Sequence, residues 1–136
     1  MLTLDSSGLL ALINTKDKNH QACRASFNRE GPPSLISIAI LSEIAWFLEA
    51  RFPSDVERTV LRDLRRGAYT LDWDTSDLTR IDELTERYRD LGLGLADAAV
   101  IACAERHGGK VLTTDRRHFP VVARGEKTIS VLPPIL

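Results

Sequence analysis

Residues 95–119, LADAAVIACAERHGGKVLTTDRRHF, contain the pattern that decides the fold. Residues 95–107 are apolar nearly all round, which predicts a helix buried between layers rather than one that lies on the surface. Gly108 and Gly109 end that helix, and KVLTT at 110–114 predicts a short strand. A helix followed at once by a strand is the repeating unit of an α/β protein with a mostly parallel sheet.

The rest of the chain continues this alternation of strands and helices. Further strands are expected at 2–5, 34–38, 68–73 and 128–133, and further helices at 7–14, 20–30, 39–52, 55–66 and 75–90. Ser54 and Glu57 form a capping-box signature at the start of one helix. We therefore expect a single domain over residues 1–136, with an α/β fold in which helices flank a mostly parallel sheet of four to five strands.

Composition and charge exclude several classes of protein. The chain of 136 residues is 43% hydrophobic and 27% charged, as in soluble domains and unlike disordered chains. Its formal net charge of −1 attracts neither nucleic acid nor anionic lipid, so binding to a polyanion requires a local patch or a bound cation. We expect no membrane span and no signal peptide. With only Cys23 and Cys103, no disulfide framework is expected, and a cytoplasmic location fits.

Four acidic residues lie where ionised side chains are costly. Asp5 and Asp115 are each the first ionisable residue after a predicted strand, at the sheet edge where α/β proteins bind ligands. Glu43 shares a helix face with apolar neighbours, and Asp97 is the only ionisable residue in 95–104. Both lie near the start of a helix, where the helix dipole favours negative charge. We therefore expect all four acids to converge on one pocket.

Four carboxylates in one pocket repel one another unless a cation is present. Mg²⁺ or Mn²⁺ suits oxygen ligands, and such an ion polarises a phosphoryl oxygen and activates water, as in metal-dependent nucleases. Separate explanations for the individual acids remain open: a helix cap for Asp5, a paired neighbour for Glu43, a buried arginine partner for Asp97 and a capped turn for Asp115.

Two other groups of residues offer alternative chemistry. Four residues are of the types that bind zinc. His20 and Cys23 lie on a helix that resembles a surface helix, whereas Cys103 and His107 lie on a helix that is apolar nearly all round, which argues against a shared site. A cluster of acids surrounds the start of the helix at 75–90 and is expected to be solvated there: Asp72, Asp74, Asp77, Asp82 and Glu83.

Four segments in this order resemble the acidic motifs of PIN-domain ribonucleases, and more narrowly of VapC-type toxins from toxin–antitoxin operons. They are LTLDSSGLLALI (2–13), SIAILSEIAWFL (37–48), LGLADAAVIACAERHG (93–108) and VLTTDRRHF (111–119). The resemblance implies a PIN-like three-layer sandwich around the central sheet. It also implies a Mg²⁺- or Mn²⁺-dependent endoribonuclease that acts as a homodimer on single-stranded or looped RNA and is neutralised by a VapB-type antitoxin.

Carried over residue by residue, the resemblance assigns the acidic quartet to Asp5, Glu43, Asp97 and Asp115. It assigns the supporting hydroxyls to Ser7 and Thr114. We expect Asp5 and Asp97 to hold the metal directly or through water, with Glu43 and Asp115 completing the shell, and one of these two orienting the attacking water.

Basic and aromatic residues near these motifs are candidates for partner contacts. Arg116 and Arg117 follow the last acid directly and are expected to bind the RNA backbone, unless one of them pairs with Asp115. A second, weaker patch consists of Arg62, Arg65 and Arg66. Adjacent aromatic residues at 46 and 47 cannot both face the same side of a helix, so one of them is available to a second subunit or an antitoxin.

Three other hypotheses compete with the ribonuclease hypothesis. A DNA nuclease would use the same carboxylate and metal chemistry, and a catalytically idle PIN-like domain would use the pocket only to bind a partner. A receiver-like signalling domain requires a pair of acids after the first strand and a lysine after a late strand. Here Ser6 and Ser7 follow Asp5, and Lys110 begins its strand, which argues against that reading.

Overall fold

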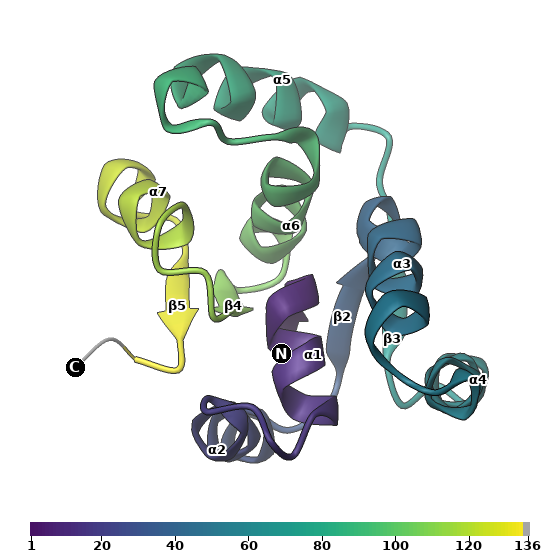
Figure 1. The fold of residues 1–136 in the computed structure, drawn as a ribbon. Coiled ribbons are helices and arrows are strands. Elements are labelled where there is room, and N and C mark those ends of the chain that lie inside the picture. Colours follow the sequence, from purple (N-terminus) through teal and green to yellow (C-terminus); the bar gives the residue numbers. More distant parts are fainter. Residues whose placement is uncertain (135–136) are drawn as a thin grey trace.

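The structure, a computed structural model, describes residues 1–134 and contains a five-stranded sheet. All neighbouring strands are parallel, in the order β3-β2-β1-β4-β5 (Figure 1). The strands are β1 (Leu2–Leu4), β2 (Ser34–Ser37), β3 (Thr70–Asp72), β4 (Lys110–Leu112) and β5 (Ser130–Leu132). The predicted parallel α/β fold is confirmed, although each strand is shorter than its predicted range.

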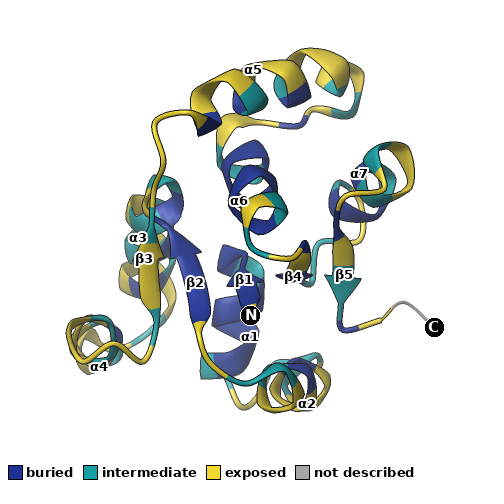
Figure 2. Ribbon diagram, turned by 180° about the vertical axis from the view of Figure 1, so that it is seen from behind, coloured by how far each residue is buried: buried dark blue, intermediate teal, exposed yellow. Residues whose placement is uncertain are grey.

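Helices cover both faces of the sheet. They are α1 (Ser6–Ile13), α2 (His20–Glu30), α3 (Leu41–Arg51), α4 (Ser54–Arg65), α5 (Asp77–Arg87), α6 (Leu95–Arg106) and α7 (Phe119–Glu126), with 3₁₀ turns at Ile38–Ile40 and Arg89–Leu91. The chain moves from β1 toward β3 and then returns toward β5. Right-handed crossovers therefore place α1–α4 on one face and α5–α7 on the other, which gives three layers (Figures 1 and 2).

The core centres on α6 and the inner strands β1 and β2. Every residue from Ala98 to Ala104 is buried, as the apolar pattern predicted, and β1 and β2 are buried along their whole length (Figure 2). Each fully buried leucine or isoleucine contributes roughly 1.5–3 kcal/mol, so these central elements dominate the stability of the domain. Within the described residues, no helix combines the length and apolarity needed to cross a membrane.

Gly8 allows α1 to approach the end of β4 at backbone distance. A Cβ atom at this position would lie 2.3 Å from the carbonyl oxygen of Leu112, which is far closer than real contacts allow. The backbone N–H of Asp5 also donates to that carbonyl, at 3.0 Å. The start of α1 is therefore fixed against the end of β4, and this junction forms one wall of the site described below.

Two local predictions differ from the structure. The helix α7 was not predicted, because its eight residues are too few for a clear period and Pro120 lies in its first turn. The capping box at Ser54 is wrong: Ser54 is the first helical residue, Pro53 holds the N-cap position, and no side chain caps the helix. Residues 55–66 nevertheless form the expected helix to within one residue at each end.

Candidate active site

The four predicted acids line one cleft of about 290 Å³: Asp5, Glu43, Asp97 and Asp115. Asp5 follows β1, Asp115 lies three residues beyond β4, and the other two lie in the first turns of α3 and α6. The strand order reverses between β1 and β4, which is the position where open parallel sheets form a binding crevice. The structure thus brings together the acids that the sequence predicted would converge.

Asp5 is fixed by two hydroxyl groups. Its Oδ2 accepts hydrogen bonds from Ser7 Oγ at 2.8 Å and from Thr113 Oγ1 at 2.9 Å. The backbone N–H of Thr114 donates to Ser7 Oγ at 3.0 Å, so the loop after β4 is tied to the start of α1. The carboxylate is 6% exposed and has little freedom to move. The predicted hydroxyl residues Ser7 and Thr114 both line the cleft, and Asp5 also accepts a hydrogen bond from Thr113, which was not predicted.

Glu43 and Asp97 face the cleft from opposite layers. Glu43 Oε1 accepts a hydrogen bond of 2.6 Å from Ser6 Oγ, which orients the carboxylate toward the start of α1. For Asp97, burial and the charges of Asp5, Asp115 and Glu43 raise the pKa to about 6, although His118 opposes this rise. The pKa of Asp5 is also raised, chiefly by burial. The negative charge in this cleft is therefore only partly compensated by the protein.

Asp115 is oriented by its own loop. Its Oδ1 accepts from the backbone N–H groups of Arg117 at 2.8 Å and His118 at 3.0 Å, and its Oδ2 lies 2.8 Å from Nδ1 of His118. Burial favours a higher pKa for Asp115, but these hydrogen bonds outweigh it and lower the pKa. The capped turn that was left open as an alternative is present, and it places Asp115 in the cleft as well.

The donor set of the cleft fits a hard divalent cation. Asp97, Asp115 and His118 each place a potential ligand atom within 4.8 Å of the others. The remaining donors are carboxylate and hydroxyl oxygens, which are the ligands that Mg²⁺ and Mn²⁺ prefer. Among residues 1–134, no arginine or lysine forms an ion pair with any of the four acids. These residues are therefore suited to hold a divalent cation.

A cation and an aromatic ring in the cleft wall were not predicted. Arg51 lies with its guanidinium carbon 4.6 Å from the centre of the Phe47 ring, and both residues line the cleft. The four-residue spacing from Glu43 to Phe47 and from Phe47 to Arg51 places all three on one face of α3. That spacing was visible in the sequence. Asp17 also lines the cleft, from the loop after α1, and its position had no sequence signal.

The predicted RNA-binding arginines lie beside the cleft rather than in it. Arg116 donates from Nη2 to the carbonyl oxygen of Pro133 at 3.1 Å, and the Arg117 side chain is exposed. Neither guanidinium pairs with Asp115, which is instead contacted by His118. Their contact with RNA stays a prediction. On α4, Arg62 and Arg65 line a separate hollow of about 290 Å³.

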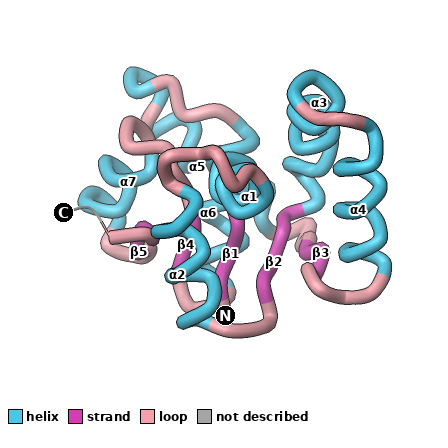
Figure 3. Tube along the Cα trace, turned by 60° about the horizontal axis from the view of Figure 1, so that its bottom comes forward, coloured by secondary structure: helices cyan, strands magenta, loops and turns pink. Residues whose placement is uncertain are grey.

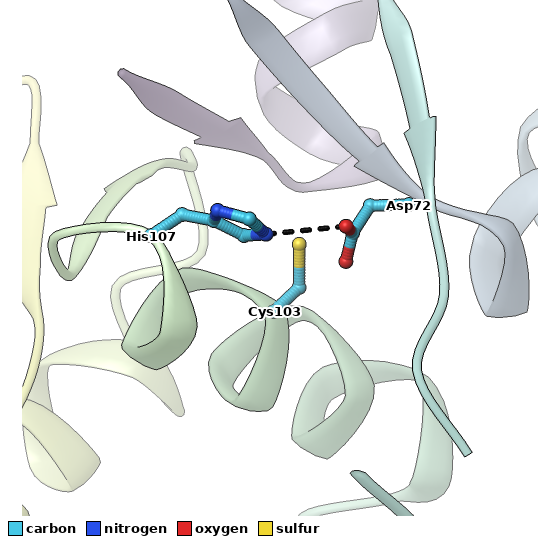
Figure 4. Close-up of side chains that lie close together, drawn as sticks. All are labelled: Asp72, Cys103 and His107. Carbon is cyan, nitrogen blue, oxygen red and sulfur yellow. Dashed lines mark hydrogen bonds and ion pairs between the residues drawn. The ribbon is translucent and has the colours of Figure 1, made fainter. Parts of the chain in front are cut away.

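The four zinc-type residues that were considered as an alternative do not form one group. His20 places Nδ1 2.7 Å from the carbonyl oxygen of Ala11, and Cys23 is buried on α2. Cys103 and His107 do come together, but their third neighbour is Asp72 at the end of β3 (Figure 4).

The acids before and at the start of α5 are not all solvated, which corrects another prediction. Asp77 is 6% exposed and receives two hydrogen bonds of 2.7 Å from Arg106, which also contacts Asp72. Asp74 is exposed as expected and caps the turn through the backbone N–H of Ser76 at 2.9 Å. No local pattern indicated this partner, because Arg106 lies at the far end of α6.

Comparisons with known proteins agree with this geometry. The sequence matches the PIN domain family over residues 2–125. It is 29% identical over 120 residues to Ribonuclease VapC26 of Mycobacterium tuberculosis, and the match covers 87% of this chain and 89% of that protein.

The fold resembles that of Mycobacterium tuberculosis VapC20, a Sarcin-Ricin loop cleaving toxin. The TM-score is 0.77, the sequence identity is 17%, and the match covers 90% of this chain and 95% of that chain. It also resembles FitAcB from Neisseria gonorrhoeae, with a TM-score of 0.66, 16% identity and coverage of 96% of each chain. The chain therefore belongs to the PIN domain family, and the curated relative that it matches is a VapC ribonuclease.

Proposed function

We propose that this protein is a metal-dependent endoribonuclease toxin that hydrolyses phosphodiester bonds in RNA and is neutralised by a cognate antitoxin. The observation that carries this proposal is the cleft in which four carboxylates converge without an arginine or lysine partner in the described chain. Membership of the PIN family and the match to a protein named as a ribonuclease support the choice of substrate.

Asp5 and Asp97 are the residues that hold Mg²⁺ or Mn²⁺ in this proposal. Ser7 and Thr113 fix the orientation of Asp5, so its direction is set before a cation arrives. When bound, the cation lowers the pKa of a water and stabilises negative charge on the phosphoryl oxygens. Asp115 supports the site from its loop, because both of its oxygens already accept hydrogen bonds there.

Glu43 is the better candidate to orient the attacking water. Ser6 holds Oε1 of Glu43, and Oε2 has no hydrogen-bond partner within the described residues. Glu43 accepts a proton from the water as the new P–O bond forms in line with the departing 3′ oxygen. The P–O3′ bond breaks, the 3′ oxygen takes up a proton from solvent, and the product carries a 5′-phosphate.

Arg51 and Phe47 form the surface that positions the substrate strand. The ring of Phe47 holds the guanidinium of Arg51 at the cleft wall, where it can contact a phosphate next to the one that is cleaved. Trp46 is 64% exposed beside the Phe47 ring and offers a face for base stacking. Arg116 and Arg117, which directly follow Asp115, are further candidates to contact the RNA backbone.

An apolar groove between α3 and α4 is the proposed binding surface for the antitoxin. These helices form a hairpin at the β3 edge of the sheet (Figure 3), and the groove has a volume of about 500 Å³. Leu61 on its rim is 55% exposed. The arginines Arg58, Arg62 and Arg65 adjoin it, which favours a partner helix with one apolar face and acidic flanks.

Binding of the purified antitoxin to Leu61→Glu tests this surface. We expect an affinity loss of at least about 100-fold, since a charge would enter the apolar groove. Leu78→Glu is a matched control, because Leu78 is 51% exposed on α5. Equal affinities of the two variants would mean that the antitoxin binds elsewhere.

The proposed homodimer is tested separately, by the mass of the free protein in solution.

Cleavage of a cellular RNA pool by the purified protein tests the function itself. We expect cuts at discrete sites with Mg²⁺ or Mn²⁺, no cuts with EDTA, and none by Asp5→Asn. Asp82→Asn is the matched control, because it removes an exposed acid on α5. Cleavage of matched DNA but not RNA would favour the DNA nuclease. A folded, antitoxin-free protein that cuts neither would favour the partner-binding domain.

A further inference from the structure

A second cluster of metal-type ligands lies outside the cleft. Asp72 ends β3, Cys103 lies on α6, and His107 follows the last residue of that helix. Their ligand atoms all lie within 4.8 Å of one another, and the sulfur of Cys103 points between the imidazole and the carboxylate (Figure 4). None of these residues takes part in the chemistry proposed above.

The hydrogen bonds within this cluster conflict with one another. Nε2 of His107 lies 3.1 Å from Oδ1 of Asp72 and also 3.1 Å from Nη1 of Arg106. The carboxylate oxygen can only accept a proton and the guanidinium can only donate one. In either tautomer, Nε2 can form a hydrogen bond with only one of these two neighbours, and its contact with the other is unfavourable. A cation between Nε2 and Oδ1 in place of this arginine contact would remove the conflict.

We propose that Asp72, Cys103 and His107 form a binding site for Zn²⁺. In a tetrahedral site, Zn–N and Zn–O bonds of about 2.0 Å and Zn–S bonds of about 2.3 Å place ligand atoms about 3.3–3.5 Å apart. The distance of 3.1 Å between Nε2 of His107 and Oδ1 of Asp72 is close to that value. The four-residue spacing from Cys103 to His107 brings both ligands to one side of the end of α6.

Arg106 can leave the cluster without losing its main partner. It holds Asp77 through Nε to Oδ1 and Nη2 to Oδ2, both at 2.7 Å, so a small rotation away from Asp72 preserves this bidentate pair. Asp72 and His107 have side-chain exposures of 17% and 26%. Solvent therefore has access to the fourth coordination position, and a water molecule can fill it. The bound ion would connect the edge strand β3 to the end of α6.

Ligand type separates this site from the catalytic cleft. Cys103 offers a sulfur and His107 an imidazole nitrogen, and both are ligand types that suit Zn²⁺. Mg²⁺ and Mn²⁺ prefer oxygen ligands such as the carboxylates of the cleft. The two sites therefore select different ions, and this proposal does not depend on the nuclease activity.

Absorption spectroscopy with Co²⁺ as a probe for Zn²⁺ tests the site in the full chain. Co²⁺ is added to the chelator-treated protein with Mg²⁺ in excess, which occupies the cleft. We expect a thiolate-to-cobalt charge-transfer band that saturates at one equivalent and disappears when Zn²⁺ is added. Oxygen ligands alone give no such band, so the signal reports on a cysteine.

Three variants identify the cysteine and its neighbours. The band should vanish in Cys103→Ser. In His107→Ala, the apparent affinity for Co²⁺ should fall at least about tenfold. It should persist in Cys23→Ser, which removes the other buried thiol. Absence of the band in the unmodified protein would overturn the proposal, and so would its persistence in a folded Cys103→Ser variant. His107→Ala alters a partly exposed side chain, so its readout remains if Cys103→Ser fails to fold.

Discussion

The two ends of α6 carry acidic residues in opposite electrostatic settings. At its start, Asp97 shares a cleft with four other carboxylates, and within residues 1–134 no arginine or lysine forms an ion pair with any of them. At its end, Arg106 binds Asp77 through two hydrogen bonds and also contacts Asp72. The chain neutralises the second group by itself and leaves the first to an external cation.

The pKa values of the two groups shift in opposite directions. Burial and neighbouring carboxylates raise the pKa of Asp97 to about 6. For Asp72, burial is outweighed by hydrogen bonds from Arg106, Cys103 and His107, and the pKa is lowered. Acidic residues therefore do not mark a functional site by number alone. A functional site is indicated instead by carboxylates that lack a cationic partner, because a fold keeps unpaired carboxylates together only at a cost in stability.

The largest expected effect is on the rate of RNA cleavage, when one acid is removed at each end of α6 in turn. Asp97→Asn should lower the rate of metal-dependent RNA cleavage at least about 100-fold, because it removes a metal ligand. Asp72→Asn should leave the rate within about threefold. Cleavage kinetics at saturating Mg²⁺, with circular dichroism to verify folding, measure both effects. Similar losses in the two variants would mean that the acids at both ends act in one site.

The next largest effect concerns stability rather than activity. Arg106→Met should lower the free energy of unfolding by about 2 kcal/mol, because it leaves the buried carboxylate of Asp77 without its partner. Arg106 is itself partly exposed, so the loss should fall below the 3–5 kcal/mol typical of fully buried pairs. Urea unfolding beside Arg117→Met, which alters an exposed arginine, measures the difference. A change no larger than in that control would contradict the pairing argument.

The sequence predicted the cleft well for local physical reasons. Asp5 and Asp115 end hydrophobic strands, and Glu43 and Asp97 interrupt apolar helix faces. Each signal depends only on neighbours within one or two turns. A parallel sheet then places strand ends and helix starts at one edge, so the convergence follows from the fold class.

Features that depend on distant partners were not predictable in this way. The acids at 72 and 77 looked solvated because their partner, Arg106, is 34 and 29 positions away. The hydrogen bond from Thr113 to Asp5 joins residues that are 108 positions apart, so no local pattern indicated it. The position of Arg51 was an exception, because its helical spacing from Glu43 was visible in the sequence.

Arg51 provides a finer test of the cleft, since it is the cation that lines this acidic surface. Arg51→Ala should raise KM for RNA about tenfold and leave kcat nearly unchanged, because the side chain binds substrate without contacting the reacting atoms. The slope of log affinity against log salt should fall by about one. Arg89→Ala, which alters an exposed arginine in the 3₁₀ turn after α5, is the control. An equal loss in kcat would assign Arg51 a role in the chemical step.

The smallest predicted effect is a gain in stability when the cleft loses a charge. The folded protein binds the Asp97 proton more tightly than the unfolded chain does, because the pKa rises from 3.8 to about 6 on folding. The free energy of unfolding of the metal-free protein should therefore decrease as pH rises from about 4 to about 6 through this group. Asp97→Asn should flatten that dependence and stabilise the metal-free protein at pH 7.5 by about 1 kcal/mol, since Asp97 is partly exposed and solvent screens the repulsion.

The acids at the other end of α6 should show the opposite sign. The pKa of Asp72 is lower in the folded protein, so its stabilising contribution is present above the unfolded value of 3.8 and is lost as pH falls through the lowered value. Urea unfolding at several pH values with EDTA separates the two contributions when Asp97→Asn is measured beside Asp72→Asn. If Asp97→Asn destabilised the metal-free protein at pH 7.5, its carboxylate would have a partner in the fold, and the contrast between the two ends would not hold.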